Sequence, residues 1–118
     1  MLFEEVVLDV DESNYEEILN RELVILQFFS DWKMNCLMTL PIVEDLAREF
    51  CEKHPELCFG RVNIDDFSEL AEKHRVVRVP TIIILRNKQL IDKIDSSFEE
   101  EMLRERFNII FNSVKISN

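Results

Sequence analysis

The stretch LVILQFFSDWKMNCLMTLP, residues 23–41, contains the two patterns from which the fold can be inferred. Its first seven residues are an almost unbroken apolar run, which is typical of a central strand covered on both faces. From Met34 to Lys53 the pattern becomes that of an amphipathic helix, with Pro41 inside it as an expected kink. The apolar stripe of this helix recurs at steps of four, three, four and three residues: Cys36, Leu40, Val43, Ala47 and Phe50. The stretch therefore predicts a buried strand that leads through a short loop into a long helix.

The rest of the chain adds strands and helices in alternation. The hydrophobic patterns predict further strands at 3–10, 57–64, 80–86 and 89–94, and further helices at 11–20, 65–74 and 97–114. Asp65 or Asp66 is expected to cap the helix over 65–74. The core face of the last helix is expected to carry Phe98, Met102, Phe107, Ile110, Phe111 and Val114. The order β-α-β-α-β-α-β-β-α predicts a mixed sheet between layers of helices, because the last two strands form a hairpin.

Composition and charge narrow the classes of function. A chain of 118 residues with one Gly and three Pro has no flexible linker, so we expect a single domain over 1–118. A net charge of −10 argues against nucleic-acid binding, because phosphates would be repelled. The acidic N-terminus is unlike a signal peptide, and no apolar stretch approaches the about 18 residues of a membrane span. With three cysteines expected to stay reduced, these features favour a cytoplasmic protein.

The element order and three motifs resemble the thioredoxin family over nearly the whole chain. Trp32, Cys36 and Pro41 fall where that family has the Trp, the second Cys and the kinking Pro of its Trp-Cys-Gly-Pro-Cys helix. VNIDD at 62–66 is similar to the third strand of the family. VPT at 79–81 is similar to the loop whose cis proline faces the thiols. The resemblance implies a three-layer α/β/α sandwich with a cis Val79–Pro80 bond.

The departures from the family lie at the positions that carry electrons and protons. Lys33 stands where the resemblance places the nucleophilic first Cys, and Gln27 stands where it places a buried acid. Dithiol exchange needs an exposed thiolate to attack and a second thiol to resolve the mixed disulfide. A lysine does not attack a disulfide in this way, and a glutamine amide does not accept a proton. These residues predict that the chain has no thioredoxin-type dithiol turnover.

Cys36, the remaining thiol of the motif, has two interpretations. In the first, it is a packed thiol that behaves as a small apolar residue, as its place in the helical stripe indicates. In the second, it is a single reactive thiol, activated by the helix N-terminus and by Lys33. In the second case it could form a mixed disulfide or sense oxidants.

Lys33 and Arg78 also have two interpretations. Each is either a solvated charge on a loop, or part of a small basic site that holds a carboxylate or an anion of a partner.

A binding groove is expected from the resemblance. Trp32, Lys33 and Arg78 would flank it, with the Trp32 side chain mostly packed and partly a wall of the groove. Val79, Pro80 and Thr81 would supply the segment with which an extended peptide pairs. Such strand addition uses backbone hydrogen bonds and needs no thiol. We therefore expect a protein or peptide partner at this groove.

The remaining Cys and His residues carry no expected chemistry. Cys51 and Cys58 are expected as free thiols, although a disulfide between them is sterically possible. His54 and His74 are expected at helix ends, and the trio of Cys51, His54 and Cys58 lacks an evident fourth zinc ligand. We expect no metal and no cofactor.

Three functions remain open from the sequence. The first is a redox-inactive thioredoxin-like protein that binds partners through the groove. The second is a monothiol oxidoreductase or redox sensor in which glutathione or a partner's cysteine resolves the disulfide of Cys36. The third is a general structural or chaperone-like role.

Overall fold

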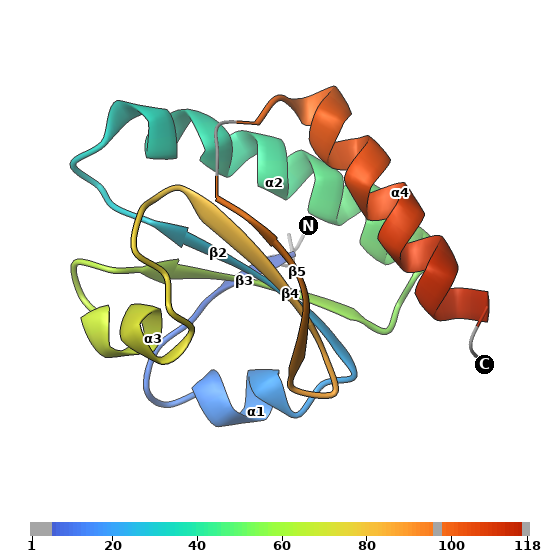
Figure 1. Ribbon diagram of the computed structural model, residues 1–118, viewed down its shortest axis with the longest axis horizontal. Coiled ribbons are helices and arrows are strands. Elements are labelled where there is room, and N and C mark those ends of the chain that lie inside the picture. Colours follow the sequence, from blue (N-terminus) through green and yellow to red (C-terminus); the bar gives the residue numbers. More distant parts are fainter. Residues whose placement is uncertain (1–5, 96–97, 117–118) are drawn as a thin grey trace, which may run out of the picture.

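The computed structural model describes residues 6–95 and 98–116 and has the predicted order of elements (Figure 1). The strands and helices follow one another as β1 (Val7–Asp9), α1 (Tyr15–Leu19), β2 (Leu23–Phe29), α2 (Met34–Lys53), β3 (Leu57–Asn63), α3 (Ser68–Lys73), β4 (Thr81–Arg86), β5 (Gln89–Ile94) and α4 (Glu100–Ile116). The strands form one sheet in the order β1-β3-β2-β4-β5. β1 and β2 run parallel to β3, whereas β4 is antiparallel to both β2 and β5. The predicted mixed sheet is thus confirmed.

Helices cover both faces of this sheet. Figure 1 shows α2 and α4 on one face and α1 and α3 on the other. All seven residues of β2 are buried, as an apolar run covered on both faces requires. β1 and β5 form the two edges of the sheet, so the three-layer α/β/α sandwich expected from the sequence is confirmed.

Aromatic side chains dominate the core between the sheet and the α2/α4 layer. Phe50 of α2 packs edge to face on Phe107 and Phe111 of α4, with ring centroids 5.6 and 5.4 Å apart. Phe59 of β3 contacts Phe107 from the sheet side at 5.9 Å. Such edge-to-face pairs add to the burial of apolar area and fix the position of α4 on the sheet.

The apolar face of α4 differs from the prediction in one residue. Leu103 is fully buried, whereas Met102, which was predicted to face the core, is 44% exposed. Phe98, Phe107 and Phe111 are buried as predicted. The choice between two adjacent apolar residues depends on the exact phase of the helix on the sheet, and the sequence pattern alone did not fix that phase. The side chain of Val114 lies outside the described residues.

The start of α3 also differs from the prediction. The helix predicted over 65–74 begins only at Ser68, and its N-cap residue is Phe67, which makes no side-chain capping bond. The prediction that Asp65 or Asp66 caps it is therefore wrong. Asp65 instead accepts hydrogen bonds from the loop after β2. The predicted residues 3–5 and 97 lie outside the described part.

In the described residues, no helix combines the length and the hydropathy needed to cross a membrane.

Gly60 allows the close packing of β1 against the middle of the sheet. It pairs with Leu8 of β1 and with Leu26 of β2. A Cβ atom at this position would lie 2.7 Å from Val10 Cγ2 and 3.1 Å from Leu26 Cδ2. The first of these distances is shorter than van der Waals contact, and the valine side chain has little rotamer freedom to move away.

We expect Gly60→Ala to lower the free energy of unfolding by about 1–3 kcal/mol, because the added methyl group overpacks a dense core. Urea denaturation followed by circular dichroism measures this change. Glu52→Ala, at an exposed position of α2, serves as the control and should leave the midpoint nearly unchanged. A wild-type midpoint for Gly60→Ala would show that the strand interior has room for a side chain.

Candidate functional site

A polar network holds the loop between β2 and α2. Ser30 Oγ donates to Asp65 Oδ2 at 2.8 Å, and the backbone amide of Asp31 donates to the same oxygen at 3.2 Å. Asn63 Nδ2 donates to Asp31 Oδ2 at 2.9 Å, and the amide of Trp32 donates to Ser30 Oγ at 3.3 Å. Because β2 and β3 are parallel neighbours, the residues after them meet at one edge of the sheet. Polar residues after two neighbouring strands were the signal for this network, and the sequence analysis missed it.

Trp32 and Lys33 are presented to solvent by this loop. Trp32 is 86% exposed. Lys33 is the exposed N-cap residue of α2, and its carbonyl oxygen accepts from the amides of Cys36 and Leu37 at 3.0 and 3.2 Å. No hydrogen bond or ion pair involves the Lys33 ammonium within residues 6–95 and 98–116. At the position where the resemblance places the nucleophilic thiol, the structure has a solvated cation.

Cys36 lies inside the protein. It has an exposed fraction of 0% and belongs to the apolar cluster on the α1/α3 side of the sheet, together with Phe28, Phe29 and Val79. A buried thiol in apolar surroundings behaves as a small hydrophobic residue. This geometry supports the first interpretation of Cys36, because a thiolate that attacks a disulfide must be accessible.

The buried polar residue of β2 is tied to α2. Gln27 is 1% exposed, and its Nε2 donates to Thr39 Oγ1 at 3.3 Å. The Thr39 hydroxyl in turn donates to the carbonyl oxygen of Cys36 at 2.7 Å. Neither side chain titrates, so this network holds the start of α2 in place but moves no proton.

The segment before β4 divides into exposed and buried side chains. The peptide bond between Val79 and Pro80 is cis. Arg78 is exposed, whereas Val79 and Pro80 are buried and Thr81 has an exposed fraction of 0%. The Thr81 hydroxyl donates to the carbonyl oxygen of Arg78 at 2.7 Å. Among the six expected groove residues, only Trp32, Lys33 and Arg78 therefore offer side chains to solvent.

The backbone amide and carbonyl groups of Val79 are unpaired within the described residues. No hydrogen bond in the part of the chain that the structure describes uses the amide or the carbonyl group of Val79. These groups lie just before β4, outside the ladder of the sheet. Backbone groups left unpaired at such a place need water or a partner.

Exposed apolar side chains gather on the loop and the first turns of α2 and on the loop before β4. Trp32, Met34 and Met38 are 86%, 70% and 65% exposed, and Val77 is 85% exposed. We call these four residues the apolar rim. Apolar side chains this exposed on neighbouring segments are typical of an interaction surface rather than of a solvated one. The sequence predicted Trp32 as mostly packed and partly a groove wall, so its exposure differs from that prediction. Met34 and Met38 fall outside the buried stripe of α2 and Val77 lies in a loop, and their exposure was not predicted.

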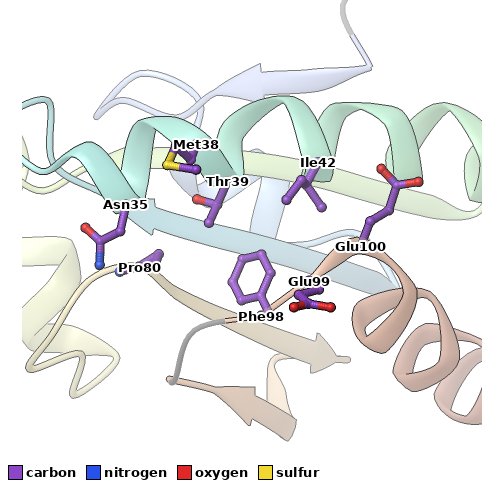
Figure 2. A pocket seen from close by; sticks show the side chains of 8 residues that line it. All are labelled: Asn35, Met38, Thr39, Ile42, Pro80, Phe98, Glu99 and Glu100. Atoms are coloured by element: carbon purple, nitrogen blue, oxygen red, sulfur yellow. The ribbon is translucent and has the colours of Figure 1, made fainter.

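A pocket of about 300 Å³ lies between α2, Pro80 and the start of α4, and it shares Met38 with the apolar rim (Figure 2). Neither Trp32 nor the other expected groove side chains, apart from Pro80, line it. Its lining consists of Asn35, Met38, Thr39, Ile42, Pro80, Phe98, Glu99 and Glu100. Phe98 was predicted to lie in the core, and the pocket was not predicted, because it forms only where segments distant in sequence meet.

The other two cysteines are free and lie away from this site. Burial raises the pKa of Cys51 to about 11, and the neighbouring Cys58 contributes to the rise. Burial also raises the pKa of the Cys58 thiol. Both cysteines are therefore thiols rather than thiolates at neutral pH.

Both histidines lie at helix ends, as expected. His54 follows α2 and His74 follows α3 as their C-cap residues. His74 Nε2 forms a hydrogen bond of 2.7 Å with Tyr15 Oη, and burial lowers the pKa of His74. Among the residues that the structure describes, no three His, Cys, Asp or Glu side chains are grouped so that they could hold a metal ion.

Comparison with known proteins places this geometry in a family. The thioredoxin family model matches residues 6–108. Thioredoxin of Chlamydia pneumoniae is 29% identical over 99 residues, which is 84% of this chain and 93% of that protein. The crystal structure of thioredoxin from Trypanosoma brucei brucei superposes with a TM-score of 0.78 at 27% identity and covers 95% of this chain and 97% of that one. Endoplasmic reticulum resident protein 44 of Bos taurus is 28% identical over 74% of this chain, but the match spans only 22% of that protein.

The burial of the cysteines predicts how each reacts with iodoacetamide. In the folded protein we expect no labelling of Cys36 at neutral pH. The labelling rate of Cys51 should rise about tenfold per pH unit and reach no plateau below its pKa of about 11, because the thiolate is the reactive form. Peptide mass spectrometry after timed quenching, with circular dichroism at each pH, measures both rates.

Denaturation in urea provides the control for this experiment. All three cysteines should then label rapidly and at similar rates, because an unfolded chain exposes them equally. Rapid labelling of Cys36 in the folded protein at pH 7 would contradict the buried position of its thiol.

Proposed function

The chain belongs to the thioredoxin family, and from this premise we propose that it binds protein partners around Pro80 without acting as a dithiol–disulfide oxidoreductase. One observation carries the proposal. The exposed N-cap of α2 holds Lys33, and the only thiol of the motif, Cys36, has an exposed fraction of 0%. A partner's disulfide that reached this surface would meet an ammonium group and not a thiolate.

The surface around Pro80 supports binding. The apolar rim offers four strongly exposed side chains, of which Met38 lines a pocket together with Pro80 and Val77 lies three positions before Pro80 in the sequence. The polar network of Ser30, Asn63 and Asp65 holds the loop that carries Trp32. A pre-formed loop loses little conformational freedom on binding. Tryptophan is also among the residues most often found to dominate binding energy at interfaces.

The unpaired backbone amide and carbonyl groups of Val79, within the described residues, support a particular mode of binding. An extended peptide could pair its own amide and carbonyl groups with those of Val79, as one more short strand. Backbone pairing of this kind supplies affinity without a thiol. The side chains of the apolar rim would then select among sequences, since all four are exposed to a partner.

The proposal covers residues 1–118 as a single domain in a reducing compartment, the cytoplasm. Three free cysteines support that location, because thiols of secreted proteins are commonly paired.

We expect the wild-type protein to reduce insulin disulfides in the presence of dithiothreitol no faster than dithiothreitol alone. Lys33→Cys should accelerate the reaction at least tenfold, because it places an exposed thiol at the start of α2, three residues before Cys36. The turbidity of precipitating insulin chains measures both rates.

The control for this variant is the double change of Lys33→Cys with Cys36→Ala. It keeps the new exposed thiol but removes the thiol that resolves the mixed disulfide, so the acceleration should be lost. If the wild-type protein accelerates insulin reduction and the single change Cys36→Ala abolishes that acceleration, the proposal is overturned. The monothiol oxidoreductase would then be favoured.

Binding is tested with a phage-displayed library of random peptides selected on the wild-type protein. Trp32→Ala should weaken the binding of the selected peptides by about tenfold or more, measured by fluorescence anisotropy. The matched control is Leu90→Ala, because Leu90 is an apolar side chain of β5 that is 55% exposed and pairs with Leu85, at the end of β4 away from Pro80. Peptides that bind Trp32→Ala and Val77→Ala as tightly as the wild type would place the binding surface elsewhere.

A further inference from the structure

We propose that the pocket between α2, Pro80 and the start of α4 receives a basic segment of the partner, with an apolar side chain inside the pocket and an adjoining Lys or Arg on Glu99. The inference deepens the proposed function and rests on it, because it names the chemistry of the segment that crosses Pro80.

The shape of the pocket indicates a side chain as its occupant. Figure 2 shows Met38 and Ile42 on the α2 side, Phe98 across from them and Pro80 at the end nearest Asn35. A volume of about 300 Å³ is at the lower end of the range for small-molecule sites. The size is suited to one or two side chains of a peptide rather than to a large cofactor.

The inner wall of the pocket offers no free hydrogen-bonding group from its buried hydroxyl and is otherwise formed by apolar side chains. Its one buried hydroxyl, that of Thr39, already bonds to Gln27 and to the Cys36 carbonyl group. Met38 is 65% exposed and its unbranched side chain can adjust to different occupants. An aliphatic or aromatic side chain would therefore be favoured here, because it removes apolar wall from water.

The edge of the pocket toward α4 is acidic. Glu100 is bound by Arg104 Nη2 at 3.0 Å, and Arg104 also binds Glu49 and Glu101. Arg104 thus already contacts three carboxylates. Within residues 6–95 and 98–116, the exposed carboxylate of Glu99 has neither an ion pair nor a side-chain hydrogen bond.

Glu99 differs from the two acids that follow it because its carboxylate has no partner among the described residues. Glu100 and Glu101 lie in the first turn of α4, where negative charge is favourable, and both bind Arg104. Glu99 directly precedes that turn, its carbonyl oxygen accepts from the Leu103 amide at 3.0 Å, and its side chain lines the pocket. A cation of the partner that pairs with Glu99 beside an apolar wall would be partly shielded from water, which strengthens the pair relative to an exposed one.

The charges that line the pocket also oppose an acidic occupant. Its charged lining residues are Glu99 and Glu100, the exposed cations Lys33 and Arg78 do not line it, and the chain as a whole carries a net charge of −10. Like charges brought together at an interface disfavour the wrong partner. A basic and apolar segment is therefore the occupant whose charge and apolarity both complement the pocket.

The test begins with the phage-displayed random peptides selected on the wild-type protein. We expect enrichment of a Lys or Arg within three residues of a Leu, Met or Phe. Glu99→Lys should weaken these peptides at least tenfold, and replacing their basic residue by Glu should restore binding to the Glu99→Lys variant. Met38→Ala should also weaken binding, and it changes a side chain that the core does not need.

Glu105→Lys is the matched control. Glu105 is an exposed acid of the same helix that does not line the pocket, so this variant makes the same change of net charge and should bind as the wild type. Equal losses for Glu99→Lys and Glu105→Lys would overturn the inference, because the effect would then be one of overall charge.

The failure of the inference is distinguishable from that of the proposed function. One outcome is that the selected peptides depend on Trp32, carry no basic residue and bind the Glu99→Lys variant as tightly as the wild type. This outcome would overturn the inference and leave the proposed function standing. Peptides that depend on Glu99 but not on Trp32 or Val77 would support the pocket and overturn binding at the apolar rim. A library without binders would count against both. If the protein self-associates and Glu99→Lys abolishes this self-association, the pocket binds a second copy of the chain. That outcome would overturn the inference that the pocket binds a basic segment of a different partner.

Discussion

The burial of β2 on both faces is the constraint on which the arrangement of the site depends. A strand without access to water can contain a polar side chain only if a hydrogen-bond partner reaches it. Gln27 meets this requirement through Thr39 of α2, and Thr39 in turn bonds to the carbonyl group of Cys36. The first turns of α2 are thereby fixed over the end of β2, and Cys36 is held in the core.

The sequence predicted the parts of the fold that depend on periodicity. The apolar run of β2 and the alternation of helical and strand patterns correctly gave the sheet and its two helical layers. The predictions were wrong where contacts distant in sequence decide between local alternatives. Asp65 could have capped α3 but instead holds the loop after β2, and Leu103 faces the core in place of Met102. In each case the local pattern permitted both outcomes, and the packing of another element selected one.

The candidate site was predictable to a smaller extent than the fold. The absence of a nucleophile at Lys33 could be seen from the residue type, because no arrangement of neighbours turns an ammonium group into a thiolate. Trp32 was predicted as mostly packed and partly a groove wall, so its strong exposure was not predicted. The exposure of Met34, Met38 and Val77 was not predicted either, because apolar residues are more often buried and the spacing of these three does not mark a separate helical face. The pocket beside Pro80 was also beyond sequence reasoning, since Phe98 and Ile42 are 56 positions apart in the printed sequence.

The retention of an exposed apolar surface on a scaffold without an accessible thiol is the feature that a purely structural role does not explain. Exposed Trp and Met side chains promote non-specific association, so a surface under no requirement to bind would be expected to replace them with polar residues. The fold itself does not need them, because the buried stripe of α2 is formed by other residues, among them Val43, Ala47 and Phe50. The loop that carries Trp32 is nevertheless held by hydrogen bonds to residues of the next parallel strand and its loop. An ordered apolar surface, unpaired backbone groups at Val79 and a pocket with an acidic edge lie in the segments that meet near Pro80, and the proposed recognition of a partner would use all three.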